Sequence, residues 1–146
     1  MLITAIQVRR LENTGTKLKG IASITLDDMI VIHDIKILKN NDVMFLAMPS
    51  KEVKARSFKD IVHPINSATR QVIEKLIFAA YVDAERRECS QLNCVLADEY
   101  ADIDFYELSY EHFTMRDCTD GGAMPSKENH AKTNAEQDDL MKWLEN

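Results

Sequence analysis

The first 63 residues alternate between apolar and polar positions with a period of about two, which is typical of β-strands. Four runs show this pattern, at residues 2–11, 17–26, 29–38 and 43–48, and a fifth strand is expected at 58–62. The turns between them are short and rich in Asn, Asp and Gly. Because short turns join neighbouring strands, the pattern predicts an antiparallel meander of about five strands.

The period changes to 3.6 after His63 and Pro64 interrupt the strand pattern. Asn66 or Ser67 is a suitable N-cap for a helix that continues to about Arg86. Its apolar stripe consists of Val72, Ile73, Leu76, Ile77, Ala80 and Ala84. One long helix laid on one face of the sheet gives a two-layer α+β core, which we place at residues 1–87.

Residues 88–146 form a second segment, called the extension below. Residues 88–113 mix aromatic and acidic side chains and predict one or two short helices. Residues 118–133, which contain Gly121, Gly122 and Pro125, predict a linker, and residues 138–144 a terminal helical turn. The fold class expected for the whole chain is therefore α+β, with a small acidic and mostly helical extension.

Charge is distributed unevenly between the two segments. The net charge of −6 argues against a nucleic-acid partner when taken alone. Residues 1–84, however, hold 12 Lys/Arg against 9 Asp/Glu, whereas residues 85–146 hold 6 against 15. This asymmetry indicates a basic core and an acidic extension with different roles.

The three cysteines, Cys89, Cys94 and Cys118, are expected to be reduced thiols. A zinc site that adds His112 to them is the alternative, but the spacing matches no compact finger signature. We therefore expect neither a metal nor a cofactor. No signal peptide is visible and the apolar runs are far too short to span a membrane, so a cytoplasmic protein is expected.

Four stretches carry a resemblance to a known family: IASITLD at 21–27, VIHDIK at 31–36, AMPSK at 47–51 and FKDIVHPINS at 58–67. In order and spacing they resemble the stage V sporulation protein G (SpoVG) family over residues 1–84. The resemblance implies a sheet with a long helix, a homodimer, and regulatory binding of DNA or RNA. The resemblance also implies a link to septation and sporulation.

The chain departs from that family at two places. The family usually shows a basic pair after Ser50, but here Lys51 is followed by Glu52. Family members also commonly end soon after the helix, whereas this chain continues for about sixty residues. The resemblance implies nothing about this extension.

Residues that could contact phosphate fall into three groups. A cation that meets a phosphate releases counterions, which favours nucleic-acid binding. The three groups are Lys51, Lys54, Arg56 and Lys59 around one loop, Thr69 and Arg70 at the start of the helix, and Arg9 and Arg10 at the end of the first strand. Arg70 has an alternative partner in Glu74 at i+4. Solvated loops and strand ends are the alternatives for the other two groups. No pattern for base recognition is present.

Catalysis is not expected. His33 and His63 lack a serine or cysteine marked as an activated nucleophile, and the chain has only 4 Gly and no phosphate-binding loop. A buried and hydrogen-bonded histidine is the better interpretation of His33.

The strand at 29–38 is apolar on both faces, which predicts a homodimer through the face that the helix leaves uncovered. Alternation places Ile30 and Ile32 on that face and Val31, Ile35 and Ile37 on the other. The expected dimer interface therefore contains Ile30 and Ile32.

The acidic and aromatic part of the extension is either the core of a small subdomain or a surface for a protein partner. Phe78 and Val82 lie on the opposite side of the helix from its apolar stripe, and we expect residues 92–113 to pack on them. Carboxylates held beside a basic core would then weaken nucleic-acid binding. The alternative function is a protein–protein adaptor that no longer binds nucleic acid.

Overall fold

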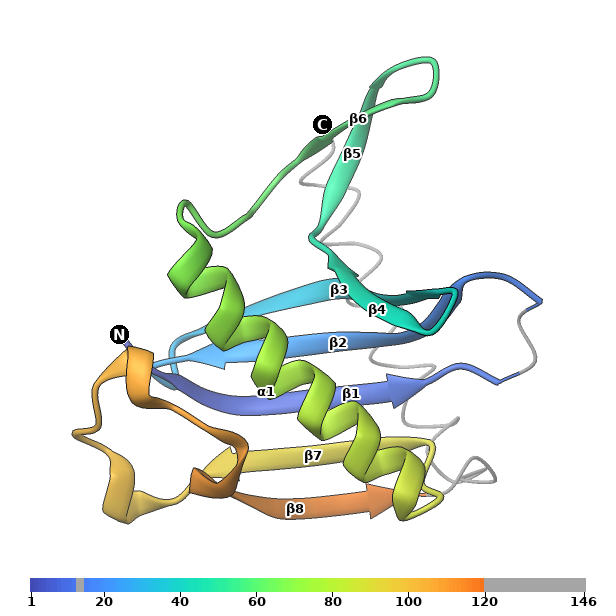
Figure 1. Cartoon of the computed structure of the whole chain (residues 1–146). Coiled ribbons are helices and arrows are strands. Elements are labelled where there is room, and N and C mark those ends of the chain that lie inside the picture. The colour runs from blue at the N-terminus through green and yellow to red at the C-terminus, as the bar shows by residue number, and fades with distance from the viewer. Residues whose placement is uncertain (13–14, 120–146) are drawn as a thin grey trace, which may run out of the picture.

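In the part of the chain that the structure describes, one α-helix runs diagonally across one face of a six-stranded antiparallel sheet, and a two-stranded hairpin projects from the sheet (Figure 1). The structure is a computed structural model that describes residues 1–12 and 15–119. The main sheet consists of β1 (Ile3–Arg10), β2 (Leu18–Leu26), β3 (Ile30–Asn40), β4 (Val43–Ala47), β7 (Gln91–Leu96) and β8 (Phe113–Thr119). The helix is α1 (Ser67–Arg86). The expected α+β class is confirmed.

The first four strands form the predicted meander, with the spatial order β4-β3-β2-β1. The expected fifth strand is β6 (Ser57–Asp60), which does not join the main sheet. It pairs instead with β5 (Ser50–Lys54) in a separate hairpin. We call residues 50–60 the arm.

The helix begins and ends where the sequence predicts. The side chain of Asn66 accepts a hydrogen bond of 2.7 Å from the backbone N–H of Thr69, so Asn66 is the N-cap. All six residues of the predicted apolar stripe are buried against the sheet. The face of the sheet beneath α1 is called the covered face below, and the opposite one the open face.

The extension contributes two strands that the sequence did not predict. β7 pairs with β1 and β8 pairs with β7, so both continue the main sheet. Between them lie three single-turn 3-10 helices, η1 (Asp98–Tyr100), η2 (Phe105–Glu107) and η3 (Tyr110–His112). The expectation of short helices is therefore right for this middle part only, and a mostly helical extension is wrong for residues 88–119. The expected helical turn at 138–144 lies outside the described residues, as does most of the expected linker.

The extension also completes the core. Leu92 and Cys94 of β7 point to the covered face and are almost fully buried. Phe78 is partly buried against the core cluster, whereas Val82 is 51% exposed, so the expected packing of the extension on Val82 is wrong. Along the described part of the chain, no helix is long and apolar enough to cross a membrane.

A β-bulge in β3 changes which side chains face the helix. Ala22 pairs with Ile35 and Ile24 with Ile32, so His33 and Asp34 together stand opposite one residue of β2. Asp34 adopts a positive φ of 61° at this point. The extra residue places Ile32 and Ile35 on the same face of the sheet.

The bulge corrects the expected dimer interface. Ile32 packs against the core on the covered face, so it is not available on the open face. Ile30 pairs with Leu26 and so lies on the same face as Ile32, although it is 62% exposed. Val31, which was expected on the helix side, lies on the open face instead. Strict alternation fails here because it cannot anticipate an inserted residue. His33, expected to be buried, is exposed, and its Nδ1 lies 3.0 Å from Ser23 Oγ.

Candidate nucleic-acid interface

The arm carries four of the predicted basic residues, and every residue of its two strands is exposed. Lys51 lies directly opposite Lys59 in the register of the hairpin, so both side chains are on the same face. Lys54 and Arg56 lie at the tip. In the described ranges, none of these four cations belongs to an ion pair with a side chain of the chain itself. The arm therefore presents its positive charge to solvent.

The other face of the arm has a different character. Glu52 lies opposite Phe58, and Ser50 opposite Asp60. Phe58 is 66% exposed and is flanked by the two carboxylates. The arm thus has a basic face and an acidic face with an aromatic centre.

Glu52, which follows Lys51 in β5, supports the turn of the arm. Its Oε1 accepts a hydrogen bond of 3.0 Å from the backbone N–H of Arg56. Arg56 has a positive φ of 62°, a conformation that non-glycine residues adopt infrequently. The carboxylate therefore helps to stabilise a tight turn that contains no glycine.

The start of α1 is engaged by other parts of the chain. Thr69 Oγ1 and Tyr106 Oη of the extension share a hydrogen bond of 3.0 Å. The guanidinium of Arg70 donates to the carbonyl oxygen of Leu46 at 3.0 Å and pairs with Glu74 at 3.6 Å. Of the two interpretations of Arg70, phosphate binding or an ion pair with Glu74, the structure contains the ion pair.

Arg9 and Arg10 point in opposite directions. Arg10 is half-buried, and its Nε donates to the carbonyl oxygen of Cys89 at 2.8 Å. Its guanidinium also lies 3.6 Å from Glu12, so its role is to connect parts of the chain. Arg9 is exposed on the open face.

The sheet register connects Arg9 to the base of the arm. Arg9 pairs with Ile21, Ile21 with Lys36, and Lys36 with Ala47, which ends β4. Directly paired residues share a face, so Arg9 and the exposed Lys36 lie on the open face two strands apart. Lys36 was not among the predicted residues. The alternation that places Ile35 and Ile37 on the helix side also places Lys36 on the open face, so the signal for this residue was present in the sequence.

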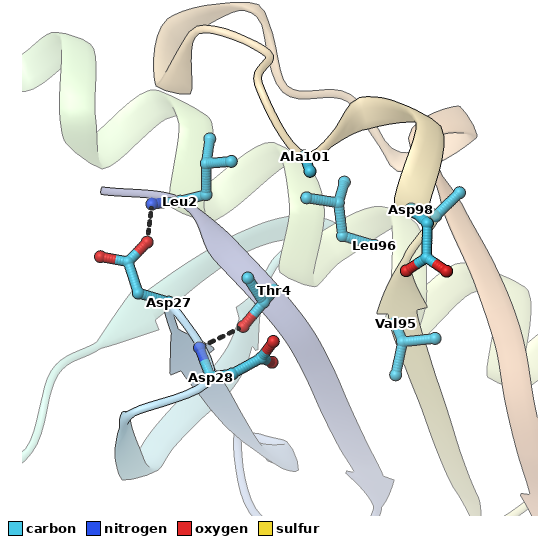
Figure 2. Close-up of a pocket in the computed structure, with 9 residues that line it drawn as sticks. Leu2, Thr4, Asp27, Asp28, Val95, Leu96, Asp98 and Ala101 are labelled. Atoms are coloured by element: carbon cyan, nitrogen blue, oxygen red, sulfur yellow. Dashed lines mark hydrogen bonds between the residues drawn. The ribbon is translucent and has the colours of Figure 1, made fainter.

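A surface pocket of about 410 Å³ lies at the other end of the main sheet, between the β2–β3 turn and η1 (Figure 2). Asp27, Asp28 and Asp98 contribute carboxylates to its lining. Asp27 Oδ1 accepts from the Leu2 N–H at 2.7 Å, and the Asp28 N–H donates to Thr4 Oγ1 at 2.9 Å. Because its charge is negative, this pocket is unsuited to phosphate.

A buried polar network joins the extension to α1, and the sequence analysis did not find it. Asp83 is 7% exposed and accepts hydrogen bonds from Tyr110 at 2.7 Å, Arg86 at 2.6 Å and Arg87 at 2.9 Å. Burial acts to raise the pKa of Asp83, but these hydrogen bonds outweigh it and hold the pKa below its ordinary value. The sequence did contain a signal for this network, because Asp83 falls among the apolar residues on the buried side of α1.

The cysteines differ from the expectation of three reduced thiols. Cys89 and Cys118 form a disulfide, and Cys94 is a buried free thiol. Among the described residues, no group of three or more Cys, His, Asp or Glu side chains is arranged to hold a metal ion.

Residues 1–83 match the family model described as SpoVG. A protein of Clostridioides difficile (strain 630), named "Putative septation protein SpoVG", is 46% identical over 84 residues, which are 58% of this chain and 90% of that protein. A protein of Listeria monocytogenes serotype 4b, of the same name with the number 1, is 47% identical over 85 residues, or 58% and 82% of the two chains. A relative in Geobacillus thermodenitrificans is 49% identical over 81 residues, or 56% and 83%. These matches stop where the extension begins, and they cover more than half of the chain, which therefore belongs to the SpoVG family.

Proposed function

We propose that this SpoVG-family chain is a regulator that binds DNA or RNA through the basic face of its arm, and that it is not an enzyme. The observation that carries the proposal is the cross-strand pair of Lys51 and Lys59. Two like charges directly opposite each other destabilise a hairpin, and a bound anion removes this cost. A phosphate backbone supplies such anions at regular spacing.

Contacts of this kind are made with the phosphates and not with base edges. The arm is a two-stranded ribbon with Lys54 and Arg56 at its tip, so its cations can follow a backbone. Arg9 and Lys36 on the open face extend the positive surface toward β1. We therefore expect affinity that depends strongly on salt and weakly on sequence. Relatives carry the name "Putative septation protein SpoVG", so the proposed role of this binding is in septation.

The test is a titration of the full chain with duplex DNA and with single-stranded RNA at several salt concentrations. Binding should weaken linearly in log[salt], and the variant with Lys51→Ala and Lys59→Ala should lower the slope on duplex DNA by about 0.9 per lost contact. Lys75→Ala is the matched control, because Lys75 is exposed on α1 away from the arm. No binding at low salt, or equal slopes for the arm variant and the wild type, would contradict the proposal.

A second candidate function is a protein–protein adaptor, and the acidic face of the arm favours it. Phe58 is exposed between Glu52 and Asp60, which is the arrangement of an aromatic anchor with a polar rim. This function predicts a basic partner protein and no dependence of its binding on Lys51. Phe58→Ser separates the two functions, because it removes the anchor and leaves the basic face intact.

We also propose that the chain forms a homodimer through the β4 side of the main sheet. Large apolar side chains are exposed on β3 and β4, namely Ile30, Val31, Val43 and Phe45. β4 is also an edge strand of the main sheet, with backbone groups available for pairing. A second copy of the chain would cover both.

A further inference from the structure

The disulfide between Cys89 and Cys118 encloses most of the described extension. The Cα atoms of these residues are 5.7 Å apart, a separation that suits a disulfide. Their separation in sequence is 29 residues, and the segment between them contains β7, the three 3-10 helices and most of β8. The bond therefore closes the extension into a loop.

The two ends of this bond are held very differently. The Cys89 N–H donates to the carbonyl oxygen of Ala84 at 3.0 Å, and its own carbonyl oxygen accepts from Arg10 at 2.8 Å. Cys89 is thus fixed to both α1 and β1. Cys118 lies in β8, an edge strand whose residues are exposed after Phe113. The bond connects an exposed edge strand to a buried residue that two hydrogen bonds fix in place.

The two cysteine residues also differ in access to solvent. Cys89 is 1% exposed, whereas Cys118 is exposed. The third cysteine, Cys94, is 2% exposed, and its Sγ lies 3.2 Å from Tyr110 Oη. Among the three cysteines, Cys118 is therefore the residue that solvent reaches, and exchange with a small thiol or disulfide is expected to begin there.

We propose that Cys89 and Cys118 form a reversible thiol–disulfide site that fastens β8 to the core, with Cys118 as the sulfur that exchanges with low-molecular-weight thiols. The proposal does not depend on nucleic-acid binding. Reducing compartments keep most cysteine pairs as free thiols. Formation of this disulfide would therefore respond to a change to oxidising conditions.

Closure proceeds by two exchange steps. The thiolate of Cys118 attacks one sulfur of a low-molecular-weight disulfide, such as oxidised glutathione, and the first small thiol leaves with its electron pair. The thiolate of Cys89 then attacks the Cys118 sulfur of the mixed disulfide and displaces the second small thiol. The protein loses two electrons and two protons, and the small disulfide is reduced to two thiols. Opening is the reverse, with a small thiol attacking Cys118.

Opening the bond should loosen β8 without unfolding α1 and β1–β4. β8 retains its pairing with β7 and the hydrogen bond of 2.7 Å from the Ser90 N–H to the Thr119 carbonyl oxygen. An edge strand with exposed backbone bonds opens more readily than the interior of a sheet. Arg116 lies within β8 and is exposed, so cleavage by trypsin after Arg116 measures this opening.

The experiment compares the full chain equilibrated with oxidised glutathione and with dithiothreitol. After unfolding and alkylation, intact mass should show one alkylated cysteine in the oxidised protein and three in the reduced protein. Trypsin should cleave after Arg116 several-fold faster in the reduced protein. The midpoint of thermal unfolding should fall by roughly 10 °C on reduction, because the closed loop restricts the unfolded chain.

Two variants keep the result specific. Cys118→Ser should behave like the reduced protein under both conditions, whereas Cys94→Ser should keep the full response to oxidant. Three alkylated cysteines in folded, oxidant-treated protein would overturn the proposal. So would a mixed disulfide on Cys118 that accumulates without closure, a bond that includes Cys94, or cleavage and unfolding that are equal in the two redox states.

Discussion

Tyr110 donates a hydrogen bond of 2.7 Å from Oη to Asp83 Oδ2, and this bond connects the extension to the buried side of α1. Burial raises the pKa of Tyr110, and the hydrogen bond to Asp83 raises it further, so the hydroxyl remains a donor at neutral pH. Tyr110→Phe removes the donor and leaves a buried carboxylate with one partner fewer. We expect a loss of about 1–2 kcal/mol in the free energy of unfolding, measured in urea. Tyr106→Phe is the matched control and should cost less, because Tyr106 is 54% exposed. Equal losses would contradict the prediction.

Asp83 should make the protein sensitive to acid. Its pKa is lowered in the folded state from an ordinary value of 3.8, so folding favours the ionised form. The stability that this contributes is present above the unfolded pKa and is lost as pH falls through the folded pKa. We expect Asp83→Asn to lower the free energy of unfolding at pH 7. Between about pH 7 and pH 3, the variant should lose less of its free energy of unfolding than the wild type does. An unchanged difference between the two pH values would show that Asp83 is not responsible.

The exposed residue Ile30 should contribute to the proposed dimer. Ile30→Glu should shift the chain toward monomer in light scattering at micromolar concentration, with a stability change within about 0.5 kcal/mol. Val82→Glu is the control, since Val82 is also exposed but lies on α1. Ile32→Glu should instead unfold the protein, because Ile32 packs against the core. A wild-type chain that is monomeric would remove the dimer from the proposal.

Glu52 should affect binding through both its charge and its hydrogen bond. Glu52→Gln removes the negative charge but keeps an oxygen that can accept from the Arg56 N–H. We therefore expect it to bind duplex DNA more tightly than wild type at low salt, with the difference disappearing at high salt. Glu52→Arg also removes the acceptor, so its gain should be smaller than its added charge implies. If Glu52→Arg binds far more tightly than Glu52→Gln, the turn does not depend on this bond.

The acidic extension should weaken binding where it approaches the start of α1. Tyr106 of η2 contacts Thr69, and its neighbours Asp104 and Glu107 are exposed. Asp104→Asn with Glu107→Gln should tighten binding at low salt by about twofold, within the reach of a Debye length of about 10 Å. Asp98→Asn with Glu99→Gln makes the same change of charge in η1 and should have a smaller effect. Equal effects would mean that only net charge matters.

These substitutions are a sharper test than removal of the extension. Truncation after Arg86 would remove Leu92 and Cys94 from the core and would leave one edge of β1 unpaired. Such a chain should lose stability or aggregate for reasons unrelated to nucleic acid.

The core could be predicted from the sequence because its signals are local. The N-cap Asn66, the buried stripe of α1 and the period of β1–β4 each depend on neighbours in the chain. β7 was missed because only its short run of six residues alternates and its partner β1 is far away in sequence. The bulge at Asp34 and the disulfide at Cys89 likewise depend on distant contacts. Of the predicted phosphate-binding residues, those on the arm stay accessible, whereas Arg10 and Arg70 are held by carbonyl oxygens that no local pattern reveals.

The position of β1 has a consequence for how the chain is made. β1 precedes the other described strands in the chain, yet in the finished sheet it is an interior strand between β2 and β7. One edge can pair with β2 as soon as residue 26 has been synthesised, but the other must wait for residues 91–95. Contacts between distant residues form late and slow folding, because a long loop must close first. During synthesis the nascent chain therefore passes through a stage with an open sheet edge, at which a chaperone or a second nascent chain can bind.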